Sequence, residues 1–390
     1  MPNVNVGVGI SREADTDVAV RNALQAALEQ ANLERAPWAF CFFTSAHLSH
    51  ADVIRETILE QAGCQALCGC SAVGVLGRGE EIERGPGVVV MVGASPSLAA
   101  MSQILPHDGA GLGQLAAVDE MRGETRALIV LPDSFRVDNT ALRDRLESEV
   151  PATQVVGAGA TDDGTLGISL QVGMEGVRSS SIALMGLSGK MEMAVGITQS
   201  CQAVGEPHFI TQAKDFVLVE LDGRPALHSF IDQGRALGIE DFQQAANQLL
   251  FGFPLDSQQP KFTGEACMVR PLAGFDQASH GLVVPYPFKP QSTMGFMHRN
   301  PETAERDMSR MVNTVAGQLS GAPDFGIYFD CAARGKGLYG RPDVDVQAIH
   351  KRLGDFPLIG MFGGFEVATA LGIPQVYTYT GVLVLFRVAG

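Results

Sequence analysis

The sequence has no long apolar run and no cluster of basic residues. None of its 390 residues lies in a segment that approaches the ~20 consecutive apolar residues needed to cross a bilayer. Lys and Arg number 28 against 43 Asp and Glu, which gives a net charge of −15, whereas a nucleic-acid-binding surface needs clustered cations. The one compact basic stretch, Arg334 to Arg341, suits a small anion better than a polymer. We therefore expect no membrane span and no nucleic-acid partner.

The sequence also shows no sign of a secretory leader or of a disulfide framework. Residues 1–17 lack a basic region followed by an apolar one. The seven cysteines are an odd number. Four of them lie in or beside apolar strands, as buried free thiols do: Cys41, Cys201, Cys267 and Cys331. These features predict a cytoplasmic protein in a reducing compartment.

What the sequence does contain is one segment pattern that occurs three times. Each copy has an apolar strand, an amphipathic helix, a short strand that ends in small residues, and a later hairpin strand. The first strands are Ala39–Thr44, Ala127–Leu131 and Gly326–Asp330, and the small-residue turns are Gly69–Ala72, Gly157–Ala160 and Gly360–Gly363. The pattern predicts an α/β fold with mixed sheets packed against flanking helices. Binding sites in such folds lie where strand ends and glycine turns converge.

The order of the copies predicts two related domains. Residues 1–205 hold the first two copies, and residues 206–390 hold the third, at 325–388. A chain of this length can bury two sizeable cores.

Four separated motifs resemble those of the FIST family of sensory domains. The motifs are Gly69–Gly74, the stretch Gly205–Phe230 with its Leu-Asp-Gly-x-Pro-Ala-Leu turn, Phe329–Arg334 and Gly360–Ala368. Their order and spacing hold from about Pro37 to Phe386. The resemblance implies a FIST amino-terminal domain followed by a FIST carboxy-terminal domain, related to the FIST region of F-box proteins.

The resemblance also implies a function. FIST proteins are regarded as intracellular sensors of small ligands, with amino acids as the suggested ligands and no cofactor. A stand-alone chain of this kind needs a downstream signalling partner, whose identity the sequence does not give. The chain departs from the family pattern at Val75, where Glu is usual, and near Thr378, where a His-Asn pair is expected. These departures favour the third copy as the site.

The predicted binding site is centred on the turn after the third copy's first strand. Arg334 offers a planar set of donors that matches a carboxylate. Glu366, on the neighbouring turn, is suited to accept from an ammonium group, and Arg270 is a second candidate cation. The alternative is that Arg334 and Glu366 only pair with each other. The remaining candidate ligand-binding residues are Gly69, Cys70, Ser71, Thr161, Asp162, Cys331, Gly360 and Gly363.

Cys331 supports a different hypothesis, a cysteine-dependent hydrolase or transferase. A nucleophilic thiol needs a base within hydrogen-bond reach, and the spacing assigns none of His280, His298 or His350 to that role. A small residue packed at a tight turn is the simpler interpretation, so the sequence favours a binding protein over an enzyme. A third hypothesis is a protein-interaction scaffold without a small ligand.

The sequence does not predict a metal site. His47 and His50 precede three cysteines, Cys64, Cys68 and Cys70, but the cysteines lack the second paired knuckle of zinc sites. The Asp162-Asp163-Gly164 stretch lacks the spaced oxygen ligands of a calcium loop.

Overall fold

The computed structural model describes residues 4–107, 125–150, 153–288 and 291–388. The chain forms two compact units. Unit 1 consists of residues 1–197, 308–376 and 380–390, and unit 2 of residues 198–307 and 377–379. All three copies of the repeat therefore belong to unit 1. Neither unit is continuous in the sequence, and the domain boundary at residue 205 stays a prediction.

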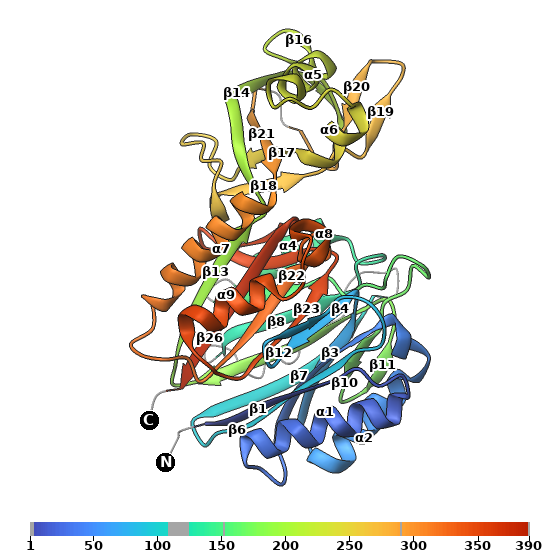
Figure 1. Cartoon of the computed structure of the whole chain (residues 1–390), viewed down its shortest axis with the longest axis vertical. Helices are drawn as coiled ribbons and strands as arrows, with labels where there is room; N and C mark the ends of the chain where they lie inside the picture. Colours follow the sequence, from blue (N-terminus) through green and yellow to red (C-terminus); the bar gives the residue numbers. More distant parts are fainter. Residues whose placement is uncertain (1–3, 108–124, 151–152, 289–290, 389–390) are drawn as a thin grey trace. The chain divides into compact units, whose positions relative to one another are not determined.

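Each copy forms the centre of one six-stranded sheet in unit 1, as Figure 1 shows. The copies are β2 (Trp38–Thr44), α2 (Ala51–Ala62), β3 (Ala66–Ala72) and β6 (Val88–Ala94); β8 (Thr125–Pro132), α4 (Asn139–Glu149), β9 (Gln154–Ala158) and β12 (Ser181–Gly189); and β22 (Phe325–Cys331), α9 (Val344–Leu353), β23 (Leu358–Gly363) and β26 (Thr380–Val388). In each copy the first two strands are parallel, and the hairpin strand is antiparallel to the first. The predicted α/β fold with mixed sheets is confirmed.

A hairpin from a different copy completes each sheet. The hairpin β4 (Gly74–Gly77) and β5 (Glu80–Ile82) joins β23; β10 (Gln171–Gly173) and β11 (Gly176–Arg178) joins β3; and β24 (Glu366–Ala370) and β25 (Ile373–Tyr377) joins β9. The opposite edges are β1 (Asn5–Ser11), β7 (Leu98–Pro106) and β13 (Met191–Gln199). Because the exchange is cyclic, every sheet contains strands from two copies.

Backbone hydrogen bonds join the three strand ends in a ring. The N–H of Thr161 donates to Ser71 O at 3.2 Å, that of Val73 to Phe362 O at 3.1 Å, and that of Gly364 to Gly159 O at 3.0 Å. In each copy the donor lies two residues after the acceptor. We call this arrangement the strand-end ring, and it brings the small-residue turns of all three copies together.

Helices cover the sheets of unit 1. Asp15 caps the N-terminus of α1 (Thr16–Ala31), because its side chain accepts a hydrogen bond from Val18 N. It packs beside α2 against the first sheet (Figure 1). α7 (Pro301–Ala316) buries Met308 and Met311 in the core against the third sheet. The short helices of this unit are η1 (Ser45–His50) and α8 (Gly335–Tyr339).

Unit 2 contains one eight-stranded antiparallel sheet. Its elements are β14 (Cys201–Lys214), β15 (Val217–Leu221), β16 (Arg224–Pro225), α5 (Ala226–Ala236), α6 (Phe242–Gln248), β17 (Leu249–Pro254), η2 (Gly264–Ala266), β18 (Cys267–Arg270), β19 (Gly274–Asp276), β20 (Gly281–Val283) and β21 (Thr293–Arg299). Phe230 of α5 stacks on Phe251 in the core, with 5.9 Å between ring centroids. In the described part of the chain, no helix combines the length and the apolar character of a membrane span.

One glycine in each copy is required by strand packing. A Cβ atom would stand 2.2 Å from Cys41 O at Gly69, 1.9 Å from Val130 O at Gly157 and 2.1 Å from Tyr328 O at Gly360. Each carbonyl belongs to the neighbouring parallel strand of the same copy. Only a residue without a side chain allows this close approach.

Replacement of Gly157 by Ala is expected to lower the free energy of unfolding by about 1–3 kcal/mol or more, because backbone must move to admit the methyl group. Urea unfolding followed by the fluorescence of Trp38, the one tryptophan and a buried residue of unit 1, measures this change. The control is Gly337→Ala, where the added atom meets nothing within 4 Å. Equal losses in the two variants would contradict the packing argument.

Candidate functional site

The turn after β22 places a buried guanidinium between two aspartates. The Arg334 side chain is fully buried. Its Nε lies 2.9 Å from Asp330 Oδ1, and its Nη2 lies 2.7 Å from Asp345 Oδ2. The sequence hypothesis that Arg334 pairs with Glu366 is not what the structure shows, because α9 supplies the carboxylate that Arg334 binds most closely.

Two tyrosines complete the hydrogen bonding of Asp345. Tyr328 Oη donates to Asp345 Oδ2 at 2.9 Å, and Tyr339 Oη donates to Oδ1 at 2.8 Å. Arg334 Nη2 also donates to Tyr339 Oη at 2.7 Å. Sequence reasoning missed Asp330, Asp345 and both tyrosines. The only local signal was the spacing of four residues between Asp330 and Arg334.

Glu366 lies on β24 and is completely buried. Its Oε2 accepts from Thr380 Oγ1 at 2.6 Å and from Thr380 N at 3.3 Å. Burial raises the pKa of Glu366 to about 8, although the bonds from Thr380, a bond from the Cys331 thiol and the charge of Arg334 oppose the rise. Glu366 therefore holds a proton over part of the neutral range.

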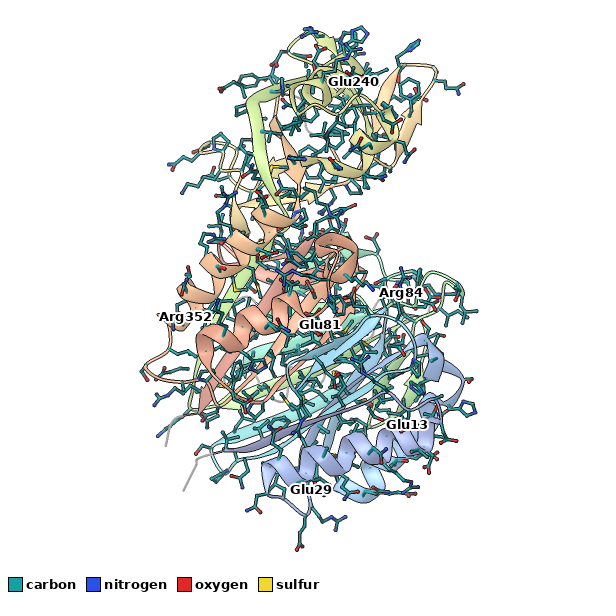
Figure 2. The ribbon with its side chains drawn as sticks, in the orientation of Figure 1. Glu13, Glu29, Glu81, Arg84, Glu240 and Arg352 are labelled. Carbon is teal, nitrogen blue, oxygen red and sulfur yellow. The ribbon has the colours of Figure 1, made fainter. Side chains whose placement is uncertain are left out.

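Two further carboxyl groups near Arg334 have raised pKa values. Burial, followed by the charge of Asp345, raises the pKa of Asp330 well above its ordinary value against the opposing effect of Arg334. The same two causes raise the pKa of Glu81 to about 8. Glu81, labelled in Figure 2, is buried in unit 1 and accepts from the N–H groups of Asp343 and Val346 at 2.8 and 3.2 Å. Asp330 and Asp345 contact the Arg334 guanidinium, and the charge of Glu81 acts on Asp330.

Three buried polar atoms of this cluster lack a hydrogen-bond partner of good geometry among the described residues. They are Arg334 Nη1, Asp330 Oδ2 and Glu366 Oε1. A buried polar group left unpaired costs about 1–3 kcal/mol. A water molecule or a group of a bound molecule that pairs with these atoms would recover that free energy.

The other predicted residues of the glycine turns lie at the strand-end ring. Ser71 Oγ donates to Thr161 O at 2.9 Å, which joins the first and second copies. The Cys70 thiol lies 3.4 Å from Met361 Sδ, which joins the first and third. At Gly363 an added Cβ would stand 2.8 Å from Ala158 Cβ, and the close packing described above accounts for Gly69 and Gly360. These residues hold the copies together.

Asp162 and Arg270, two further predicted site residues, make other contacts. Asp162 Oδ1 accepts from Gly164 N at 2.9 Å, and Oδ2 accepts from Leu166 N and Gly167 N at 2.7 and 2.8 Å. Both oxygens therefore close a loop. Arg270 lies on β18 in unit 2, where its Nη1 donates to Val269 O at 2.8 Å.

In the part of the chain that the structure describes, the residues weighed for metal binding do not form a ligand cluster. His47 Nδ1 lies 2.9 Å from Thr16 Oγ1, and burial raises the pKa of the Cys64 thiol to about 12. In the described ranges, no three His, Cys, Asp or Glu side chains are arranged to hold a metal ion. An open hollow of about 770 Å³ elsewhere in unit 1 contains none of the predicted site residues; it is lined by Arg21, Gln25, Leu28, Glu29, Asn32, Leu33, Glu34 and Gln61.

Comparison with known proteins matches two family models to the chain. The FIST N domain matches residues 38–224, and the FIST C domain matches residues 234–369. "Uncharacterized protein Rv0628c" of Mycobacterium tuberculosis is 25% identical over 386 residues, which cover 98% of this chain and 100% of that protein. "Uncharacterized protein Mb0898c" of Mycobacterium bovis is 26% identical over 384 residues, covering 98% of this chain and 99% of that protein.

One solved structure also aligns along the chain, a cyanuic acid hydrolase from A. caulinodans. It is 9% identical and covers 99% of this chain and 100% of its own, with a TM-score of 0.33. A similarity of that size carries no argument about fold or function.

The buried carboxyl of Glu366 is expected to make unit 1 less stable as the pH rises. Because its pKa is about 8 in the folded chain against 4.5 ordinarily, its favourable contribution is complete below pH 4.5 and is lost as the pH rises through 8. Glu366→Gln should therefore gain up to about 1.4 kcal/mol per pH unit relative to wild type within this window. Urea unfolding at several pH values measures the difference, with exposed Glu13→Gln as the control. A flat difference for Glu366→Gln would refute the assignment.

Loss of the planar guanidinium should destabilise unit 1 strongly. Arg334→Lys cannot reproduce the contacts of Nε and Nη2 with Asp330 and Asp345, and it leaves buried charge unpaired, which costs about 3–5 kcal/mol. The matched control is Arg12→Lys, whose exposed pair with Glu80 is worth about 1 kcal/mol or less. Similar urea midpoints for the two variants would contradict this expectation.

Proposed function

The chain belongs to the FIST family, and from this membership we propose that it is a sensory protein whose small ligand binds around Cys331, Arg334 and Glu366. FIST domains are associated with small-ligand sensing and signalling. The proposed ligand is an amino acid or a similar small polar metabolite. We further propose that the protein acts in the cytoplasm and passes the binding signal to a separate signalling protein.

The observation that supports this proposal is the set of three buried atoms without partners. One is a donor, Arg334 Nη1, and two are acceptors, Asp330 Oδ2 and Glu366 Oε1. An amino acid carries groups of both kinds. In the proposed complex Glu366 accepts from the amino group, and Arg334 Nη1 donates to the carboxylate.

A nucleophilic role for Cys331 is less well supported. The side chain that bonds to its thiol is the Glu366 carboxyl. A neighbouring carboxylate disfavours the thiolate that nucleophilic catalysis requires. The scaffold hypothesis, in turn, gives no role to a buried cluster of unpaired polar atoms. Ligand binding therefore remains the function that the site supports best.

A thermal-shift screen with amino acids and small carboxylates tests the proposal. A ligand present at about 100 times its dissociation constant should stabilise wild type by roughly 2.7 kcal/mol. The shift should disappear in Glu366→Gln and persist in Glu13→Gln, with Trp38 fluorescence as the check on folding. A shift that persists in Glu366→Gln would place the ligand elsewhere, and no shift across the panel would count against an amino-acid ligand.

A further inference from the structure

We propose that the ligand is selected by a positively charged ammonium group, and that its binding releases protons from the buried carboxyl groups around Arg334. The inference rests on the proposed function, because it concerns the ligand of the same site. It concerns which end of the ligand is recognised, and it predicts that simple carboxylates are rejected.

The first argument is the balance of charge. Four buried acids lie in this cluster: Asp330, Asp345, Glu366 and Glu81. Asp330 and Asp345 contact the Arg334 guanidinium. The charges of Asp345, Glu81 and Glu366 all disfavour ionisation of Asp330. When these acids ionise, negative charge exceeds the positive charge of Arg334; an anionic ligand increases that excess, whereas an ammonium group offsets it.

The second argument is that Arg334 has little left to offer a carboxylate. Its Nε and Nη2 already contact Asp330, Asp345 and Tyr339. The planar pair of donors that makes arginine a carboxylate receptor is therefore occupied, and a single donor, Nη1, has no partner of good geometry. For a carboxylate, Arg334 therefore has the two N–H groups of Nη1 rather than a planar pair of donors from two nitrogens.

The third argument is that the unpaired acceptors suit an ammonium group. Glu366 Oε1 and Asp330 Oδ2 are two buried carboxyl oxygens without a partner of good geometry. An ammonium group has three donors and no acceptor. It matches these oxygens, and it matches them best when both carboxyl groups are ionised.

The groups packed around the site set the proton balance. β22 supplies Tyr328, Asp330 and Cys331, and β24 and β26 supply Glu366 and Thr380. Arg334 lies in the turn before α8, Tyr339 on α8, Asp345 on α9 and Glu81 on β5. Burial raises the pKa values of Tyr328 and Tyr339, so both stay neutral. Glu366 and Glu81, each with a pKa of about 8, hold the protons that a bound cation displaces.

Isothermal titration calorimetry with matched probes tests the proposal on the full chain. One set is L-alanine, L-alaninol and L-lactate, and a larger set is L-leucine, L-leucinol and 2-hydroxyisocaproate. The amino acid and the amino alcohol should bind, and the hydroxy acid should bind at least about tenfold more weakly. Titrations at pH 7 in two buffers that differ in ionisation enthalpy should show net proton release. Affinity for the amino alcohol should rise from pH 6 to pH 8.

Each outcome decides between the two proposals. A hydroxy acid that binds as tightly as the amino alcohol, or net proton uptake, would overturn the inference and leave the proposed function standing. No binding by any of the six probes would count against the proposed function itself. Glu366→Gln should lose both amine affinity and proton release, while Glu13→Gln retains them. Proton release that is unchanged in Glu366→Gln would show that the cation is held elsewhere.

Discussion

Unit 1 depends on the ring of backbone hydrogen bonds that joins its three strand ends. Each copy donates one such bond to a second copy and accepts one from the third. Each copy also sends its hairpin into the sheet of another. Because no copy can complete its own sheet, the three acquire their ordered strand ends together. The small residues at these ends, Gly69, Gly157 and Gly360, allow the close strand approach that the ring requires.

The Arg334 cluster cannot be explained by stability alone. A buried ion pair loses much of its Coulomb attraction to desolvation, and well-packed apolar residues of similar volume would often serve equally well. In this cluster the desolvation penalty is larger, because burial raises the pKa values of Asp330, Glu81 and Glu366. A polar group that destabilises the folded chain and remains partly unpaired is typical of a binding site, where a ligand supplies the missing partner.

The sequence predicts what is local and repeated. Strand patterns and small-residue turns identify the three copies and the α/β class. The family motifs lead to the turn at Cys331. The destination of each hairpin is not local: the residues after Ala72 pair with β23, almost 300 positions away. Nothing in a short window of sequence encodes such a pairing.

The same limit applies to side-chain partners. The sequence selects Arg334 and Glu366 as candidates, but their closest partners are Asp345 on the following helix and Thr380 on the last strand. Both contacts depend on where the helix and the strand lie in the folded unit. The glycines of the turns have a structural role that the sequence analysis did not include, because an adjacent strand leaves no room for a Cβ atom at Gly69, Gly157 or Gly360; their predicted contact with a ligand stays a prediction.

A comparison of the three copies shows how the third differs from the others at the proposed site. Thr44, Asp133 and Cys331 occupy equivalent positions, each paired with the last turn residue of its copy, Ala72, Ala160 or Gly363. The Thr44 hydroxyl donates to Gly85 O and accepts from Gly87 N. The Asp133 carboxylate accepts from Phe135 N and Ser180 N.

In the first two copies, the side chain at this position, Thr44 or Asp133, therefore makes strong hydrogen bonds with nearby backbone groups. The third copy places a thiol there, which is a weak donor, beside a buried carboxyl whose Oε1 lacks a partner of good geometry. A stronger donor, such as an ammonium group, can displace the contact with the thiol at little cost. In the first two copies, a ligand would have to break the hydrogen bonds of Thr44 or Asp133 with the backbone. The asymmetry among three otherwise similar copies therefore supports the surroundings of Cys331 and Glu366 as the proposed binding site.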